Sequence, residues 1–316
     1  MGLLIQKSGM LSTIQDLGRY GYRQFGINPN GVMDPAAARL VNLLLGNDEN
    51  AAVLEMHYPA AQIELRDDHF FAVGGADLGG MLDDKPIDNW RPHRASKGSI
   101  LRFTSRVSGA RAYLAIAGGL ELNPWLGSTS TNLAAKVGGL EGRALRTGDI
   151  IRTNPPTKDI ADRRVSHNLI PHYSRFPTVR VTVGAEYHLL SEAAKQTLVE
   201  HDFVISNNSN RMGFRLEGEA IELVEPTELV SSAVNFGTIQ LIPGGQLIVL
   251  MADQQTTGGY PRIAHVISHD LPLLAQLSAG DRVAFHLVGQ EESERIAAAY
   301  ERELCLFRVG CNFNYR

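Results

Sequence analysis

The stretch GDRVAFHLV (Gly280–Val288) shows the pattern that decides the fold of this chain: a Gly-Asp turn followed at once by a short run rich in apolar residues. Gly148 and Asp149 precede IIR in the same way, and Gly98 and Ser99 precede ILRF. Turn residues directly ahead of short apolar runs are typical of β-strands joined by tight connections. The pattern predicts a mainly β chain with a few helices.

The clearest helix signal begins at Asp34. Asp34 is a favoured N-cap, Pro35 suits the first helical position, and three alanines follow. Gly46 and Asn47 then end a helix that reaches Leu45. Further helices are predicted at Tyr187–Val199, Leu271–Leu277 and Glu291–Glu303.

A segment rich in proline and charge interrupts this pattern in the middle of the 316 residues. It predicts an N-terminal domain at 1–153, a linker at 154–177 and a C-terminal domain at 178–310. The two halves also resemble each other locally, because LSTIQDLGRYG (Leu11–Gly21) and FGTIQLIPGGQ (Phe236–Gln246) share Thr-Ile-Gln. In each half a glycine-containing loop with an aspartate follows, and then a helix-like stretch. Two related β domains explain this similarity, and so does chance.

Composition excludes several classes of protein. The net charge of -4 argues against a nucleic-acid or anionic-membrane partner. Cys305 and Cys311 match no zinc spacing and no disulfide framework, so we interpret them as reduced thiols. No apolar run is long enough for a membrane span, and the first residues do not form a signal peptide. These features predict a cytoplasmic protein.

The common nucleotide, metal and nucleophile motifs are missing. Gly26–Gly31 has the glycine spacing of a phosphate-binding P-loop, but Val32 and Met33 replace its Lys and Ser/Thr. The sequence contains no GxGxxG, HExxH or GxSxG motif. The scattered histidines, among them His57, His93 and His265, are interpreted as structural. We therefore predict no metal site and no covalently bound cofactor.

Two arginine-containing stretches are candidates for anion binding. In TIQDLGRYG (Thr13–Gly21), Gln15, Asp16 and Arg19 offer an amide, an acceptor and a forked donor. A salt bridge between Asp16 and Arg19 within a structural loop is the alternative. In SNRMGFRL, Arg211 and Arg215 share one face if the segment is a strand, which predicts a carboxylate or phosphate site. Ordinary surface charge is the alternative.

A third stretch, MADQQTTGGYPRI (Met251–Ile263), follows an apolar run and is polar and rich in glycine. A buried strand that ends in such a loop is a common way to bring side chains to a binding site. Asp253 is a candidate base or water-orienting group, and Arg262 a candidate anion ligand. The hydroxyls of Thr256 and Thr257 can donate hydrogen bonds, and Gly258 and Gly259 allow a ligand close to the backbone. An exposed structural turn is the alternative.

These stretches carry a resemblance that extends over essentially the whole chain. The blocks, in order, are SGMLSTIQDLGRYGYRQFGI, GVMDPAAARLVNLLLGN, RAYLAIAGGL, LGSTST, GGLEGRALRTGD, SNRMGFRLEG and TTGGYPRI. The chain resembles the biotin-dependent carboxyltransferase family, also called allophanate hydrolase subunit 2, which includes the C subunit of 5-oxoprolinase and an antagonist of a sporulation-kinase inhibitor. Gln254 departs from the family pattern, which has a small residue there.

The resemblance implies two cyclophilin-like β-barrel domains in tandem. With that fold, Met251–Ile263 is expected to be a ligand-facing loop at a barrel mouth. It also implies an ATP-dependent 5-oxoprolinase that opens 5-oxo-L-proline to L-glutamate together with an A subunit and a B subunit, the latter being itself cyclophilin-like. ATP, with or without Mg²⁺, is expected at a site shared with the B subunit. The candidate catalytic residues are Asp253, Asp34 and Arg215. The candidate residues for substrate and anion binding are Gln15, Asp16, Arg19, Arg211, Gln240, Gln255, Thr256, Thr257, Gly258, Gly259, Tyr260 and Arg262.

Two other functions stay open at the level of sequence. One is a non-catalytic partner that binds a kinase-inhibitor-like B subunit. The other is a biotin-dependent carboxyltransferase acting on urea or a similar amide, for which a separate biotin carrier is required because this chain has no biotinyl-lysine segment.

Overall fold

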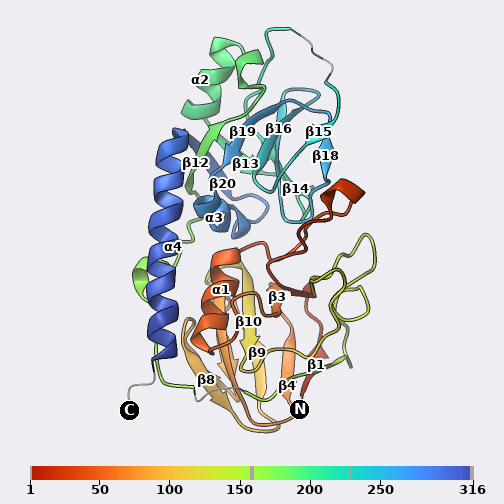
Figure 1. Cartoon of the computed structure of the whole chain (residues 1–316), viewed down its shortest axis with the longest axis vertical. Coiled ribbons are helices and arrows are strands. Elements are labelled where there is room, and N and C mark those ends of the chain that lie inside the picture. The colour runs from red at the N-terminus through yellow and green to blue at the C-terminus, as the bar shows by residue number, and fades with distance from the viewer. Residues whose placement is uncertain (1, 157–159, 226, 228, 314–316) are drawn as a thin grey trace. The chain divides into compact units, whose positions relative to one another are not determined.

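The computed structural model of the chain describes residues 2–156, 160–225, 227 and 229–313 (Figure 1). The chain divides into two compact units. Unit 1 contains the residues up to Arg19, Asn30–His172 and the residues from Arg302 on, and unit 2 contains Tyr20–Pro29 and Tyr173–Glu301. The chain passes from one unit to the other at residues 19–20, 29–30, 172–173 and 301–302, and only the third of these passages lies within the segment predicted as a linker. Residues 157–159 of that segment lie outside the described residues.

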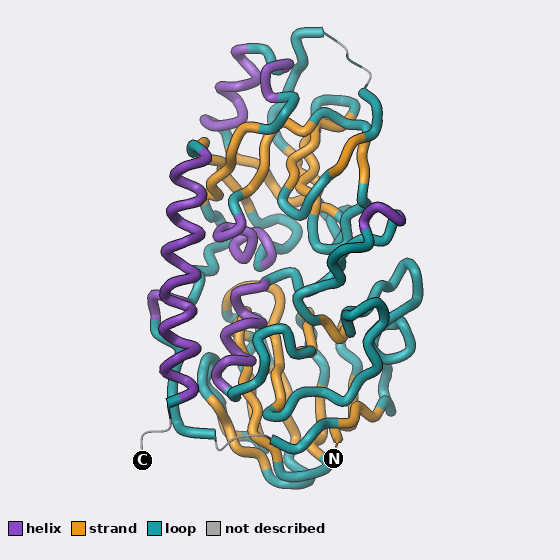
Figure 2. Tube along the Cα trace, viewed as in Figure 1, coloured by secondary structure: helices purple, strands orange, loops and turns teal. Residues whose placement is uncertain are grey.

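Unit 1 is built from two antiparallel sheets around one apolar core (Figure 2). The first sheet has the order β11-β1-β4-β9-β6-β7 and the second β2-β3-β10-β5-β8. Its strands are β1 (Gly2–Lys7), β2 (Ser12–Gln15), β3 (Val53–His57), β4 (Gln62–Leu65), β5 (His69–Asp77), β6 (Gly80–Leu82), β7 (Lys85–Pro86), β8 (Pro92–Ala95), β9 (Ile100–Phe103), β10 (Ser108–Ile116) and β11 (Ile150–Arg152). Inward-facing residues such as Ile14, Leu54 and Leu114 fill the core.

Unit 2 is a closed seven-stranded barrel with the order β12-β19-β16-β17-β14-β13-β20. Its strands are β12 (Thr178–Val183), β13 (Asp202–Ile205), β14 (Gly213–Glu217), β16 (Thr238–Ile242), β17 (Gln246–Leu250), β19 (Arg262–Val266) and β20 (Arg282–Leu287). A separate pair, β15 (Ser232–Ala233) and β18 (Thr257–Gly258), lies outside the barrel. Buried apolar residues such as Phe203, Ile239 and Val249 fill the barrel. The prediction of a mainly β chain is therefore confirmed.

The helices follow the predictions with shifts that have local causes. Helix α1 (Pro35–Leu44) begins as predicted, because the Asp34 carboxylate accepts a hydrogen bond from the Ala37 amide at 2.9 Å. Helix α2 (Glu192–Glu200) begins later than predicted, because the Ser191 hydroxyl caps it. Helix α3 is Leu271–Ala275, helix α4 is Gln290–Asn312, and the 3-10 helices are η1 (Arg23–Phe25), η2 (His167–Leu169), η3 (Tyr187–Leu189) and η4 (Ser268–Asp270).

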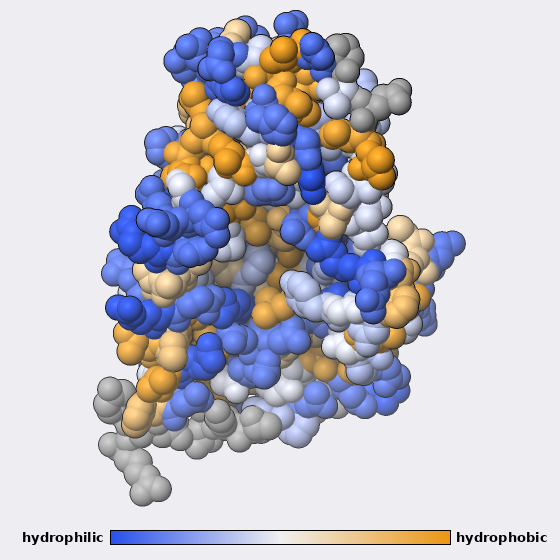
Figure 3. Space-filling model, turned by 45° about the horizontal axis from the view of Figure 1, so that its top comes forward, coloured by the Kyte–Doolittle hydropathy of each residue, from blue (hydrophilic) through white to orange (hydrophobic). Residues whose placement is uncertain are grey.

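The surface carries both polar and apolar areas, as Figure 3 shows for one face. Exposed large apolar side chains of unit 2 include Val183, Met212, Val224, Val230 and Tyr260. None of the helices in the part of the chain that the structure describes has the length and apolar character required to cross a membrane.

Candidate functional site

Asp16, which follows β2 in unit 1, is a structural anchor. Its carboxylate accepts hydrogen bonds from the Ser128 hydroxyl at 2.7 Å, the Ser130 hydroxyl at 2.6 Å and the Thr129 amide at 2.6 Å. The Thr129 hydroxyl and the Gly18 amide donate to it as well. A carboxylate with five donors has no lone pair left for a ligand. Asp16 therefore fixes the Ser128–Ser130 segment against β2.

Arg19 is fully buried and is bound by the same region. Its guanidinium donates to the Trp125 and Ser130 carbonyls and to the Asn30 side chain, and it lies 4.7 Å from the centre of the Trp125 ring. Each of these contacts stabilises the loop rather than leaving the guanidinium open for an anion. The residues predicted as an anion site in TIQDLGRYG thus hold the fold of unit 1 together.

Asp34 is also completely buried, and it caps α1. Close to it, the Tyr113 hydroxyl donates to Glu55 and accepts from the Asp34 amide, both at 2.9 Å. Burial raises the pKa of Tyr113 well above its ordinary value, and the charges of Glu55 and Asp34 add to the shift. The sequence did not reveal this buried network. It attaches the start of α1 to β3 and β10.

Gln15 and Gln240, both predicted to bind substrate, differ in what surrounds them. The Gln15 amide group donates to the Thr131 carbonyl at 3.3 Å and to the Thr13 hydroxyl at 3.1 Å. Its buried oxygen has no hydrogen-bond partner among the residues that the structure describes. Gln240 donates to the Tyr260 carbonyl at 3.2 Å and lines a cavity in unit 2.

Arg211 and Asp253 form a bidentate ion pair in unit 2. Two nitrogens of Arg211 lie 2.9 Å and 3.0 Å from the two carboxylate oxygens of Asp253, and the Asp253 amide donates to the Arg211 carbonyl. Arg211 lies before β14, which begins at Gly213, so strand alternation does not apply to it. Arg211 is buried, whereas Arg215 is exposed, and the two do not share a face. This pairing satisfies the carboxylate that was predicted to act as a base.

Arg262 is paired as well, with Glu186. The Glu186 carboxylate accepts from the Arg262 side chain at 2.7 Å and 2.9 Å and from its amide at 2.9 Å. These hydrogen bonds hold the pKa of Glu186 below its ordinary value and raise that of Arg262. Burial lowers the pKa of the nearby His265, and the positive charge of Arg262 lowers it further. The pair joins the start of β19 to the loop before η3.

Arg215 differs from the other candidate arginines. Within the described residues, no acceptor lies within bonding distance of its guanidinium. Arg215 faces Ile248 across β14 and β17, and Ile248 faces Gln240 across β17 and β16. Their neighbours Phe214, Val249 and Ile239 point into the apolar barrel, so this row lies on its outer face.

A cavity of about 480 Å³ opens above this row. The side chains of Asn208, Asn210 and Gln255 contribute amides, Arg215 contributes the charge, and Tyr260 contributes an aromatic ring. Met212, Ile248 and Leu250 are among its apolar lining residues. The loop after β17 therefore reaches a ligand-sized cavity, but over the outer wall of the barrel and not at the barrel mouth.

The other residues predicted in this loop do not all lie in the cavity. Gln255 and Tyr260 line the cavity, whereas Thr257 and Gly258 form β18. A side chain at position 258 would collide with the Gln240 amide, because an added Cβ lies 2.7 Å from its nitrogen. The Thr256 carbonyl accepts from the Val234 amide at 3.2 Å. Gly258 therefore permits the close packing that places Gln240 beneath the loop.

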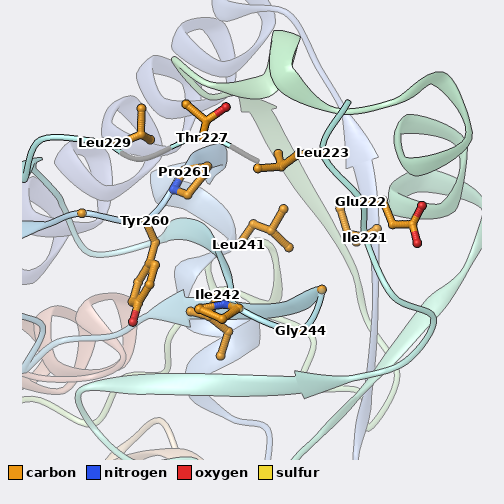
Figure 4. A pocket seen from close by; sticks show the side chains of 13 residues that line it. Ile221, Glu222, Leu223, Thr227, Leu229, Leu241, Ile242, Gly244, Tyr260 and Pro261 are labelled. Atoms are coloured by element: carbon orange, nitrogen blue, oxygen red, sulfur yellow. The ribbon is translucent and has the colours of Figure 1, made fainter. Parts of the chain in front are cut away.

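A second cavity of about 680 Å³ adjoins the first and is lined mainly by apolar residues (Figure 4). Ile242, Pro243 and Tyr260 line both cavities, and Gly259 and Pro261 line the second. In Figure 4 the side chains of Leu223 and Leu241 point toward each other, while the Tyr260 ring points away from them. Tyr260 thus stands between a polar and an apolar compartment.

Metal binding finds no support in the side-chain clusters. Among the described residues, no group of three or more His, Cys, Asp or Glu side chains is arranged to hold a metal ion.

Similar proteins agree with this architecture. Residues 25–287 match the family model of the carboxyltransferase domain, subdomain A and B. The chain is 39% identical to the C subunit of 5-oxoprolinase from Haemophilus influenzae over 285 residues, which is 90% of this chain and 91% of that protein. Identity to the C subunit of 5-oxoprolinase from Escherichia coli is 39% over 92% of this chain and 93% of that protein.

Larger relatives contain a comparable region. Urea amidolyase of Saccharomyces cerevisiae is 29% identical over 91% of this chain, which spans only 17% of that enzyme. The crystal structure of Kluyveromyces lactis urea carboxylase covers 100% of this chain with a TM-score of 0.92 at 25% identity, using 30% of that structure. The chain therefore belongs to the carboxyltransferase-domain family that includes the C subunit of 5-oxoprolinase.

Proposed function

We propose that this chain is a subunit of an ATP-dependent 5-oxoprolinase and that, with the A and B subunits of that enzyme, it opens 5-oxo-L-proline to L-glutamate. The observation that carries this proposal is the unpaired Arg215 guanidinium, within the described residues, in a cavity lined by side-chain amides. The match to the C subunit of 5-oxoprolinase along nearly its whole length supports it.

The chemistry of the cavity fits 5-oxoproline, a small lactam with one carboxylate. A guanidinium binds a carboxylate with two parallel hydrogen bonds, which assigns the carboxylate to Arg215. The lactam has one N–H donor and one carbonyl acceptor. Asn210, Gln240 and Gln255 offer both donors and acceptors, so they can bind the lactam edge. Ile248 and Leu250 are suited to pack against the carbon atoms of the ring.

The positive charge of this cavity is too small to bind the triphosphate of ATP without groups from another subunit. Arg211 is neutralised by Asp253 and Arg262 by Glu186, which leaves Arg215 as the unpaired cation of this cavity in the described part of the chain. One positive charge matches one carboxylate and is too little for a triphosphate. We therefore infer that ATP, with Mg²⁺, binds where the B subunit adds further charge.

The reaction follows from the weak reactivity of a lactam. Transfer of the γ-phosphoryl group of ATP to the lactam oxygen gives a good leaving group, with ADP released. Water then adds to the ring carbon and the C–N bond breaks, which gives γ-glutamyl phosphate. A second water hydrolyses this acyl phosphate to glutamate and phosphate. In our proposal this chain binds and orients the lactam, while Asp253 and Asp34 have structural rather than proton-transfer roles, since each is held by protein donors.

A biotin-dependent carboxyltransferase acting on urea or a similar amide is the second candidate, favoured by the similarity to urea amidolyase and urea carboxylase. An amide-lined cavity suits urea as well as a lactam. We place it second because identity is lower and the chain corresponds to a small part of those enzymes. A free carboxylate on the substrate separates the two candidates, because urea has none for Arg215 to bind.

The test is release of glutamate from 5-oxo-L-proline with ATP by this chain mixed with the A and B subunits, each component being omitted in turn. We expect turnover only in the complete mixture, and a loss of most of it in Arg215→Ala. A stable complex with the B subunit but no turnover would contradict the proposal and favour a regulatory partner. Transfer of carboxyl from a biotinylated carrier to urea would favour the second candidate.

A further inference from the structure

We propose that Arg23 and Asn28 are positioning residues of the cavity on the outer face of the barrel. They bind the two ends of Asp253–Thr256, the short stretch that brings Gln255 to this cavity. The effect on substrate binding rests on the proposed function, whereas the effect on the loop itself does not.

The segment that contains both residues comes from the N-terminal part of the chain. Tyr20–Pro29 lies within unit 2, although the residues on either side of it in sequence belong to unit 1. Its 3-10 helix η1 (Arg23–Phe25), red in Figure 1, lies near β14 and β18. In the sequence, Gly26–Gly31 is excluded as a P-loop and GYRQFGI is part of a family block, but neither feature indicates this contact.

Arg23 binds one end of the loop. Its guanidinium donates to the Thr256 carbonyl at 3.3 Å and also to the Val234 carbonyl and the Asn235 side chain. The Thr256 carbonyl accepts from the Val234 amide as well. Arg23 therefore joins residues 234–235 and residue 256 through one charged group, and charge-assisted hydrogen bonds are the stronger kind.

Asn28 binds the other end of the loop. Its side-chain amide donates to the Asp253 carbonyl at 3.1 Å. The Asp253 carboxylate is at the same time held by Arg211, and the Asp253 amide donates to the Arg211 carbonyl. The backbone at position 253 is thus fixed from two sides.

Gln255 lies between these two fixed points. Gln254 is buried and its backbone amide donates to the Met251 carbonyl, while Gln255 is exposed and lines the cavity. Hydrogen bonds at both ends of this four-residue stretch restrict the backbone from which the Gln255 side chain extends. A backbone that is ordered before the ligand arrives reduces the entropy cost of binding.

The first experiment measures amide hydrogen exchange on the chain alone, so that it does not depend on any activity. In Arg23→Ala and Asn28→Ala we expect a peptide covering residues 253–257 to exchange about tenfold faster than in the unaltered chain, because local openings become more frequent. Peptides from β16 and β17 are expected to keep their rates. Gln24→Ala, which changes an exposed neighbour in the same 3-10 helix, is the matched control. Unchanged exchange at 253–257 in both variants would overturn the positioning role.

The second experiment measures KM and kcat for 5-oxo-L-proline in the complete mixture of subunits. We expect Arg23→Ala to raise KM about tenfold with kcat nearly constant, since binding geometry and not chemistry is affected. Arg23→Lys keeps the charge and is expected to recover part of the loss. A general loss of folding would instead lower the melting temperature, and kcat would fall in parallel with the amount of folded protein. If the unaltered mixture has no turnover, the proposed function fails, and hydrogen exchange still decides the positioning role.

Discussion

The tripeptide Thr-Ile-Gln occurs in both units and shows how one strand sequence can have two uses. Thr13–Gln15 lies in β2 and Thr238–Gln240 in β16, and all six residues are buried. In each strand the isoleucine points into the apolar core, and the threonine and glutamine point to the other face. The strand sequence therefore sets the alternation in both units in the same way.

The two regions differ in what covers the outward face. In unit 1 the Ser128–Thr131 segment closes over Gln15, because Asp16 binds Ser128, Thr129 and Ser130. In unit 2 Leu241 continues the strand into a hairpin, and Gln240, although buried, lines a cavity that Arg215 also lines. We conclude that the residue after the tripeptide, and the segment bound to that residue, separate a glutamine packed inside unit 1 from one in the wall of a cavity.

The largest effect is expected for Asp16→Ala. Removing this carboxylate leaves several buried donors without an acceptor, and we expect the free energy of unfolding to fall by about 4 kcal/mol. Chemical unfolding in urea measures it, with the exposed Asp48→Ala as control. If the free energy of unfolding falls no more than in the control, the comparison of the two units fails. Unit 1 would then not depend on the Ser128–Thr131 segment that Asp16 binds.

Arg215→Ala is expected to lower kcat/KM for 5-oxo-L-proline about 100-fold, which corresponds to about 2.7 kcal/mol of lost charge-assisted binding. The melting temperature is expected to stay nearly constant, because the side chain is exposed and unpaired among the described residues. Steady-state kinetics of the complete mixture is the measurement. Arg94→Ala, at an exposed ion pair of unit 1, is the control. Normal kinetics in Arg215→Ala would remove the substrate site from this cavity.

The variant Asp253→Asn distinguishes two roles of this residue, a catalytic base and a member of a structural ion pair. Because Asp253 and Arg211 are mostly buried, the variant is expected to lose about 2 kcal/mol of unfolding free energy. A catalytic base instead predicts full stability with no turnover. Thermal unfolding and turnover measured on the same preparation distinguish the two, and the second result would restore Asp253 as a catalytic candidate.

Gln15→Ala and Gln240→Ala test the comparison directly, as a matched pair. We expect Gln15→Ala to cost about 1 kcal/mol of stability and to leave KM unchanged, since it loses the hydrogen bonds to the Thr131 carbonyl and the Thr13 hydroxyl. For Gln240→Ala we expect KM for the lactam to rise about tenfold, equivalent to about 1.4 kcal/mol. If Gln15→Ala raises KM and Gln240→Ala lowers only stability, the assignment of the cavity-lining glutamine to unit 2 is wrong.

The smallest expected effect is the pH dependence of the stability that Glu186 contributes. The pKa of Glu186 is held below its ordinary value by Arg262, so its contribution to stability is present above that ordinary value and is lost as pH falls through the lowered pKa. Glu186→Gln is therefore expected to be less stable than the unaltered chain at neutral pH, with a difference that disappears in acid. Melting temperatures measured from neutral to acidic pH test it. A constant difference across this range would contradict the role of the charge.

Local sequence signals predicted the elements well where their causes are local. The Asp34 cap and Pro35 gave the start of α1, and the turns before Ile100, Ile150 and Arg282 gave the starts of β9, β11 and β20. Helix α4 extends to Asn312, beyond the predicted end at Glu303, because no glycine or proline stops it there. The division of the strands of unit 1 into two sheets had no local signal, since pairing joins residues far apart in sequence.

The candidate site was predictable in its residue types but not in their partners. The polar loop after β17 and Arg215 were found from sequence, and both contribute to a cavity. Arg19, Arg211 and Arg262 looked equally available, and each proved to be bound by protein groups. Arg23 and Asn28 were missed because their hydrogen bonds join segments that are distant in the chain. Asn208 was missed because the cavity that it lines is formed by several segments.

By itself, then, the sequence determined the mainly β character, the start of α1 and the starts of β9, β11 and β20, because turn residues, caps and alternation act over a few neighbouring residues. The ordered sequence blocks indicated the family. Only the tertiary structure decided which of the candidate arginines are bound by protein groups and that Arg215, within the described residues, is not. A guanidinium takes whatever carboxylate or carbonyl the fold brings within about 3 Å, and that distance depends on strand pairing and loop packing across the whole unit. Arg215 differs from Arg211 for this reason: the fold places Asp253 beside one of them and a cavity beside the other.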